Sequence, residues 1–203
     1  MASAERSWTL NALKLTVSKI DSATEIVLDN LVTSFEVAQG EHAVDFIPTI
    51  AGGRIPKLDP AKETKITMEL YPTGADYKST VPTGISQLFF GTADETTAIS
   101  STITNSRSLF RITALLTYGT PSTPSNATGA LTTTQSWRFV FADGYMTEHS
   151  TSFSDFVLKA NATFVFPPFD NLGNACMKEE STSASESLSA LANYTSTVQA
   201  TKW

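Results

Sequence analysis

The amino-acid sequence predicts a mainly β protein: a subunit of β-sandwich or barrel type with one short flanking helix and a long loop or hairpin arm. First, apolar and polar residues alternate with period two in several separate runs, as in strands that bury one face. Second, the chain contains 23 Ser and 30 Thr, together 53 of its 203 residues. Threonine is β-branched and favours strands, whereas serine favours turns, so the composition also indicates a β protein.

The first three alternating runs follow one another closely. Residues 13–18 alternate cleanly, Asp21 and Ser22 offer a turn, and a second run covers residues 24–28. A third run covers residues 31–37. Because short turns join antiparallel neighbours, these runs predict a three-stranded meander.

The middle of the chain predicts one amphipathic strand and one helix. Residues 64–70 place Ile66, Met68 and Leu70 on one face against polar residues on the other. Residues 83–91 fit a short helix that begins at a threonine N-cap and ends at a glycine.

Three further strands are predicted in the second half. Residues 110–118 are apolar on both faces, which indicates a central strand with the run at 137–141 as its neighbour. Trp137 alternates in phase with two phenylalanines, so we expect it in the core. Asp143 and the following glycine should end or bend that strand. Residues 156–166 form the last strand before two prolines.

Residues 41–61 predict an arm. A loop of this length is unusual inside a compact domain, and this one carries too much apolar surface to remain in water. We expect a hairpin that turns at residues 51–53 and packs on another subunit; the alternative is that it folds back on its own sandwich. The residues assigned to this contact are Phe46, Ile47, Ile50, Gly52, Gly53, Arg54, Ile55 and Leu58.

The arm belongs to a single predicted domain. This domain covers residues 1–174, and residues 175–203 form a Ser/Thr-rich, flexible C-terminal tail.

Charge and motif content argue against several function classes. The net charge of −6 and the absence of a basic cluster disfavour a nucleic-acid reader. Cys176 is the only cysteine, and His42 and His149 have few partners, so we expect no metal site and no cofactor. We interpret His149 as a turn residue. No nucleophile elbow or phosphate-binding loop occurs, so we expect a structural protein rather than an enzyme, without a membrane partner.

Several stretches of the chain resemble the major tail tube proteins of tailed double-stranded DNA viruses, archaeal ones especially. Together they cover about half of the chain. They are residues 46–58, residues 64–72, residues 137–143, residues 158–170, the pair Gly173–Asn174 and the pair Glu179–Glu180.

The resemblance implies subunits that close into hexameric rings, and rings that stack into the tail tube through which viral DNA passes. The implied partners are further copies of the chain, other tail proteins such as a terminator, a baseplate or tip and a tape measure, and DNA in transit. The implied location is the tail of a virion assembled in the host cytoplasm. Carboxylates in the lumen would repel phosphate. The acidic candidates for a lumen-facing position are Glu36, Asp45, Glu63 and Glu69.

Three alternatives remain open on the sequence. The first is the inner tube of a contractile injection machine, which shares the ring logic but moves effectors instead of a genome. The second is a β-sandwich adhesin or carbohydrate-binding module, in which Trp8 and Trp137 would form a platform. The third is an enzyme with an unrecognised site.

Overall fold

The computed structural model describes most of the predicted β regions. The described residues are 12–21, 25–28, 32–40, 44–58, 60–71, 108–118, 135–154, 157–182, 188–194 and 202–203. The helix predicted at 83–91 lies outside them. The strands are β1 (Ala12–Lys19), β2 (Glu25–Val27), β3 (Val32–Ala38), β4 (Val44–Pro48), β5 (Arg54–Leu58), β6 (Thr64–Leu70), β7 (Phe110–Tyr118), β8 (Gln135–Ser154), β9 (Val157–Phe166) and β10 (Met177–Thr182). All pairings are antiparallel, so the predicted mainly β class is confirmed.

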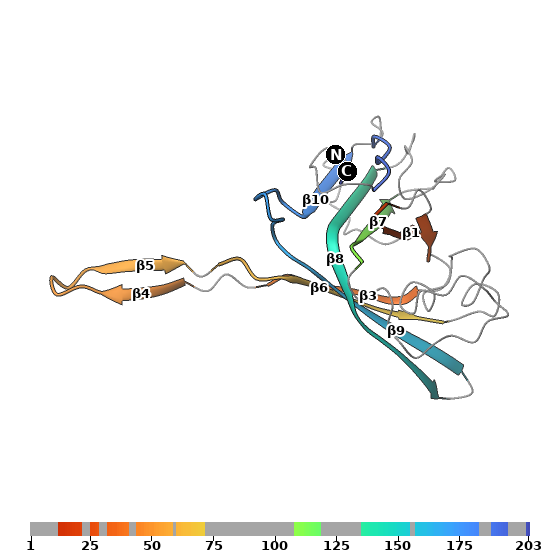
Figure 1. Cartoon of the computed structure of the whole chain (residues 1–203), viewed down its shortest axis with the longest axis horizontal. Helices are drawn as coiled ribbons and strands as arrows, with labels where there is room; N and C mark the ends of the chain where they lie inside the picture. Colours follow the sequence, from red (N-terminus) through yellow and green to blue (C-terminus); the bar gives the residue numbers. More distant parts are fainter. Residues whose placement is uncertain are drawn as a thin grey trace, which may run out of the picture.

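One long strand, β8, joins two sections of the main sheet. Its first half pairs with β7 on one side and β10 on the other, and its second half pairs with β9. The strand order is β2-β1-β7-β8-β9-β6-β3, with β10 beside β8 and a separate β4-β5 pair. Figure 1 shows β8 curving between the two sections.

The bend in β8 occurs at Asp143 and Gly144, where the sequence predicted an end or a bend. Asp143 has a φ of 60°, in the left-handed region that few residues other than glycine adopt. The pairing registers with β7 and β9 shift close to this point. The chain therefore turns from one sheet section into the other without leaving the strand.

The core lies between the inner faces of the two sections. The alternation in β6 buries Ile66, Met68 and Leu70, as predicted. β9 adds Phe164 and Phe166 to the same cluster. From the opposite section, β1 contributes Leu15 and Val17, and the first half of β7 contributes Phe110, Ile112 and Ala114. β7 is buried on both faces, which confirms that it is central and that the 137–141 run is its neighbour.

The predicted meander is wrong in its third strand. β1 and β2 do pair, but β3 pairs with β6. Alternation indicates which face of a strand is buried, but not which strand lies beside it. β6 offers β3 a ladder from Val32 to Ala38, whereas β2 has only three residues.

Two interpretations in β8 also need correction. Trp137 is only partly buried, whereas Arg138 and Val140, on the opposite face, are almost completely buried. The reason is that a neighbouring carboxylate neutralises Arg138, which alternation cannot show. His149 lies within β8, opposite Ala162 of β9, and not in a turn.

The described part of the predicted tail contains structure where the sequence indicated none. Met177–Thr182 forms β10 against the first half of β8. Tyr194 and Lys202 are buried as well. The domain boundary at residue 174 stays a prediction.

We expect Gly144→Ala to destabilise the fold by about 2 kcal/mol, because a Cβ there would lie 2.2 Å from the ring of Phe166. Urea denaturation of the purified chain measures the change. Gly173→Asn is the control: Gly173 has a φ of 83° and no atom within 4 Å of the added Cβ, and asparagine tolerates this backbone conformation. Equal stability of Gly144→Ala and the natural chain would contradict tight packing at the bend.

Candidate functional site

The β4-β5 pair is a two-stranded hairpin, as the sequence predicted for the arm. Ile47 lies opposite Ile55, and Phe46 lies opposite Pro56. At the turn, the Thr49 N–H donates to the Gly53 carbonyl at 2.8 Å. Gly52 has a φ of 81°, a conformation that glycine adopts without strain. The glycines of the arm therefore make a turn.

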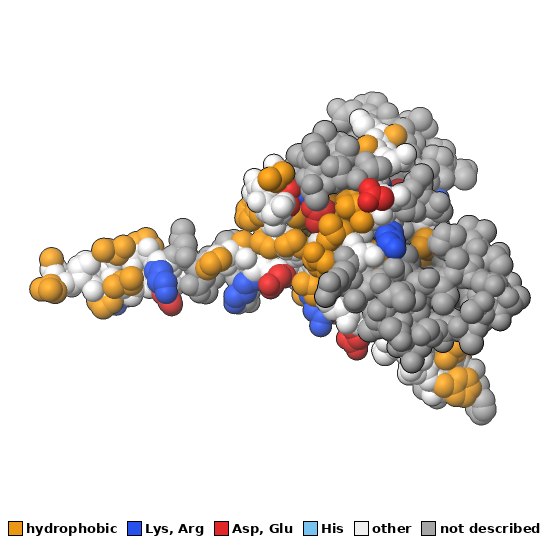
Figure 2. All heavy atoms as spheres, in the orientation of Figure 1, with side chains coloured by type: hydrophobic (Ala, Val, Ile, Leu, Met, Phe, Trp, Pro, Cys, Tyr) orange, Lys and Arg blue, Asp and Glu red, His pale blue; other side chains and the backbone are white. Residues whose placement is uncertain are grey.

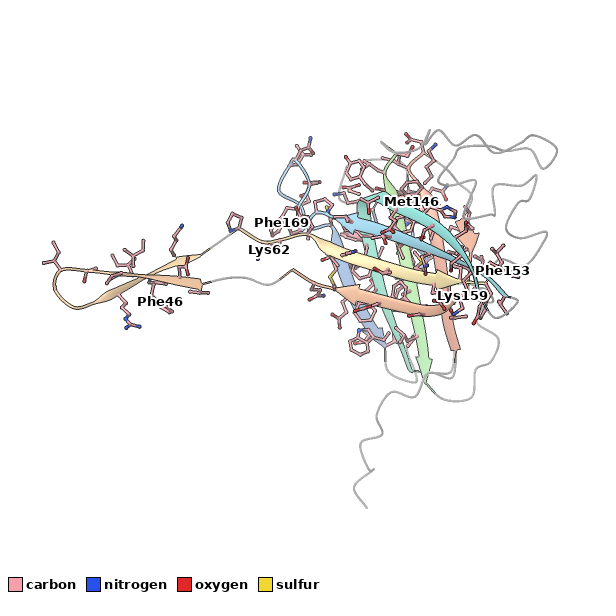
Figure 3. The ribbon with its side chains drawn as sticks, turned by 90° about the horizontal axis from the view of Figure 1, so that it is seen from below. Phe46, Lys62, Met146, Phe153, Lys159 and Phe169 are labelled. Carbon is pink, nitrogen blue, oxygen red and sulfur yellow. The ribbon has the colours of Figure 1, made fainter. Side chains whose placement is uncertain are left out.

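The arm extends away from the body of the protein (Figure 1). Phe46 lies far from the strands that carry Met146 and Phe153 (Figure 3). The predicted alternative, an arm folded back on its own sandwich, is not the arrangement in this structure.

Large apolar side chains cover both faces of the arm and remain exposed (Figure 2). Phe46 is 57% exposed, Ile47 51% and Ile55 56%, and Ile50 at the turn is fully exposed. Arg54 is also exposed, and the side chain of Leu58 is not among those that the structure describes. That these residues contact another subunit stays a prediction, but the structure leaves their apolar surface uncovered.

The predicted acidic residues separate into two places. Glu36 on β3 and Glu69 on β6 share the face of their sheet section that is turned away from the core. Glu63 is exposed just before β6, and Asp45 lies on the arm, opposite Lys57. Two of the four candidates therefore share one face.

That polar face is mixed in charge. Lys159 Nζ lies 3.2 Å from Glu69 Oε1, and the Thr33 hydroxyl donates to the same oxygen at 3.0 Å. These two hydrogen bonds lower the pKa of Glu69. Glu69 is thus hydrogen-bonded to side chains of its own sheet section, whereas Glu36 and Glu63 are exposed.

An apolar pocket of about 480 Å³ opens between β3 and the section formed by β7, β8 and β10. Two of its aromatic side chains, Phe139 and Phe141, are stacked with centroids 6.4 Å apart. Sequence reasoning missed this pocket because its walls come from four strands that are distant in the chain. The lining residues are Phe35, Val37, Gln39, Ala114, Leu116, Phe139, Phe141 and Met177.

A buried ion cluster lies at the bend of β8. Lys202 Nζ lies 2.7 Å from Asp143 Oδ2 and 2.7 Å from Asp170 Oδ2, and the Lys202 side chain is fully buried. The Tyr194 hydroxyl donates to Asp143 Oδ1 at 2.6 Å and accepts from the Asp143 N–H at 2.8 Å. Cys176 Sγ lies 3.9 Å from Lys202 Nζ.

The cluster changes the acidity of its members. Burial lowers the pKa of Lys202, but its bonds to Asp143 and Asp170 outweigh this, so the pKa is raised. The bond from Lys202 also holds the pKa of Asp170 well below its usual range. Burial raises the pKa of Cys176 to about 11, which keeps the thiol protonated at neutral pH.

Two buried arginines form hydrogen bonds with the C-terminal segment, which comprises the described residues 188–194 and 202–203. Arg111 donates to the carbonyls of Ala192 at 2.8 Å and Lys202 at 3.2 Å. Arg138 pairs with Glu180 and donates to the Ser189 carbonyl at 2.9 Å. No motif in the sequence indicated this cluster, because Asp143, Asp170 and Lys202 are 27 to 59 positions apart. The only hint was a basic residue, Arg138, at an alternating apolar position of β8.

Two kinds of feature are absent from the described residues. None of their His, Cys, Asp and Glu side chains gather in a group of three or more that could hold a metal ion. In the same part of the chain, no helix has the length and apolarity to cross a membrane.

Comparison with known proteins gives matches of fold only. No protein-family model matches the chain, and no curated protein matches it. Among solved structures, the anti-feeding prophage baseplate contains a chain that is 8% identical, with a TM-score of 0.49 over 89% of this chain and 97% of that one.

Two further solved structures give similar values. The tube-terminating cap of the same prophage is 9% identical, with a TM-score of 0.46 over 90% of this chain and 100% of the other. The sheath–tube complex of an extracellular contractile injection system, PVC, is 12% identical, with a TM-score of 0.45 over 83% and 89%. Because these three scores lie below 0.5, this likeness carries no argument about function.

We expect Lys202→Met to destabilise the protein at pH 7 by about 3 kcal/mol, because it leaves two buried carboxylates without their cation. The loss should shrink toward pH 5, since protonation of one carboxyl then relieves the repulsion. In the natural chain, Asp170 stabilises the fold above its unfolded-state pKa of about 3.9, and this stability is lost as the pH falls through the lower folded-state value.

Urea denaturation at pH 7 and pH 5 measures both effects. The control is Lys178→Met, which removes a partly exposed partner of Glu180 and should cost less than about 1 kcal/mol at either pH. A Lys202→Met chain as stable as the control would show that the cluster contributes nothing to folding.

Proposed function

We propose that this chain is the structural subunit of a tail tube: it assembles with its own copies into stacked rings, six subunits to a ring, and viral DNA passes through the lumen. The observation that carries the proposal is the β4-β5 arm, which extends from the body and exposes apolar side chains on both faces (Figure 2). A soluble monomer gains nothing from such a projection, whereas an assembling subunit gains a contact with its neighbour.

Burial of the arm against a neighbour would contribute to association. Each half-exposed side chain such as Phe46, Ile47 or Ile55 would contribute about 1 kcal/mol on burial. Because apolar residues occupy both faces of a two-stranded ribbon, the arm is suited to lie between two surfaces rather than on one. That geometry supports an arm bridging neighbouring subunits or rings.

The edges of the main sheet support closure into a ring. β2 and β3 stand at the two ends of the strand order, and β10 stands beside β8. Edge strands present backbone groups that pair readily with another chain, and closing subunits into a ring removes such edges. Identical subunits can pair one another's edge strands in this way, so no other protein is needed to cover those edges.

The polar outer face of the β3-β6-β9 section supports its assignment to the lumen. It carries Glu36, with the exposed Glu63 just before β6, and its valines, Val157 and Val165, are smaller than the phenylalanines that fill the opposite face. At −6 per chain, six copies carry −36. Net negative charge repels phosphate, so duplex DNA could slide past without binding.

The arm is tested with Ile47→Ser combined with Ile55→Ser. These side chains lie opposite each other on one face of the hairpin and are about half exposed, so the monomer should keep its stability. Assembly should fail at concentrations at which the natural chain forms tubes, with the required concentration raised by about tenfold or more. Negative-stain electron microscopy across a concentration series measures this.

The matched control is Phe153→Ser combined with Leu172→Ser, which removes two comparably exposed apolar side chains outside the arm. Its tubes should form normally. Tubes of normal length from the arm variant would contradict the assembly role of the arm.

The lumen assignment is tested with Glu36→Lys combined with Glu63→Lys. Rings should still form, because neither residue is in the core, but duplex DNA should now be retained by the tubes, and retention should fall steeply with salt. Co-sedimentation of DNA with assembled tubes at two salt concentrations measures this.

The control is Asp45→Lys, a reversal on the arm, which lies outside the proposed lumen. If both reversals retain DNA equally, the polar sheet face is not the lining.

A further inference from the structure

The ion cluster at the bend of β8 has an unusual composition for a structural ion pair. One amine, Lys202 Nζ, lies within 2.7 Å of oxygens of two different carboxyl groups. The side chains of Asp143 and Asp170 are 7% and 4% exposed, and that of Lys202 is fully buried. A single Lys–Asp pair would already neutralise the charge, so the second carboxylate calls for an explanation.

We propose that Lys202 and Asp143 form an intramolecular amide bond, between Nζ of the lysine and Cγ of the aspartate, and that Asp170 carries the proton in this self-catalysed step. The proposal does not depend on the tube function, because it concerns one folded chain. It makes the C-terminal segment a covalent part of the sheet.

The two carboxyl groups have different surroundings, and these assign their roles. Asp170 accepts the N–H groups of Leu172 and Asn174, each at 2.8 Å, and the Asn174 side-chain amide at 3.0 Å. These donors favour its ionised form, so the carboxylate is unprotonated and can accept a proton from Lys202. Because the same donors make it a weak base, this transfer is uphill and sets a slow rate.

Asp143 has fewer donors and is the better electrophile. Besides Lys202, it receives the Tyr194 hydroxyl on Oδ1 at 2.6 Å and a weak contact from the Cys176 thiol at 3.7 Å. Amine attack on Cγ places negative charge on a carboxyl oxygen. The Tyr194 hydroxyl already points at Oδ1, where it would stabilise that charge.

The step balances without an oxidant or a cofactor. The Lys202 ammonium passes a proton to Asp170, which delivers it to Oδ2 of Asp143. The freed amine nitrogen then attacks Cγ of this neutral carboxyl group to form the C–N bond. The nitrogen gives up a second proton to Oδ2, and the C–Oδ2 bond breaks as water leaves. Asp170 ends as a carboxylate, and the ammonium and carboxylate charges become one neutral amide.

The fold favours the reaction in two further ways, by positioning the reacting groups and by burying them. The β8 bend and the C-terminal segment hold Lys202 Nζ at hydrogen-bond distance from the Asp143 carboxyl group, so the two groups do not have to find each other by diffusion. The reacting side chains are buried, which favours loss of water over its return. The resting form is the ion pair, so the bond should form slowly after folding rather than during it.

The test is the intact mass of the purified chain, with any affinity tag placed before Met1, followed after purification until it no longer changes. The natural chain should become lighter by one water molecule. Lys202→Arg keeps the positive charge but should retain its full mass. Asp143→Ala and Asp170→Asn should also retain full mass, the first for want of the electrophile and the second for want of the proton carrier.

Tryptic peptides then locate the bond. An acylated Lys202 resists trypsin, so the expected product joins residues 139–159, which contain Asp143, to residues 179–203 with Trp203 still attached. Residues 179–203 joined instead to residues 160–178, which contain Asp170, would overturn the assignment of Asp143.

Two other outcomes would overturn the bond itself. One is an unchanged mass of the natural chain. The other is a loss of water that persists in Lys202→Arg, because cyclisation of Asp143 onto the N–H of Gly144 loses the same mass without the lysine. Lys159→Arg, a surface lysine paired with Glu69, is the matched control and should lose water as the natural chain does.

Discussion

The bend in β8 at Asp143 and Gly144 is the constraint on which the rest of the structure depends. A single strand serves both sheet sections, so the angle between them is set where the backbone turns. Gly144 lets the ring of Phe166 approach its backbone, and Asp143 adopts a left-handed conformation that few side chains accept. The Tyr194 hydroxyl and Lys202 bind Asp143 and hold it in this conformation. The C-terminal segment therefore stabilises the fold at the bend of β8.

Among the described residues, a folded body is distinct from the arm, whose apolar side chains remain exposed. The body contains the core, and its buried charges are neutralised by one another. The arm has no core of its own, since a two-stranded ribbon exposes both faces, and an isolated hairpin is at best marginally stable in water. Its order and its apolar character therefore make physical sense only when another surface covers it, which is the basis of the proposed assembly.

Much of the fold was predictable because strand alternation reports directly on burial. The runs at 64–70 and 110–118 and the arm hairpin with its glycine turn all occur where the sequence indicates them. The partner of β3 was not predictable, since pairing depends on the length and position of distant strands. β10 was missed because its residues are mostly charged or hydroxylated, and its structure depends on β8 lying beside it.

The sequence by itself determined the β class, the faces of most strands and the existence of an apolar arm, because these follow from local spacing and turn chemistry. The tertiary structure alone decided where charge could be buried. Arg138, Asp143, Asp170 and Lys202 are ordinary polar residues in the sequence, and only folding brings each to a partner of opposite charge. A buried charge is tolerated only when such a partner is within a few ångströms, and that distance is a property of the whole fold.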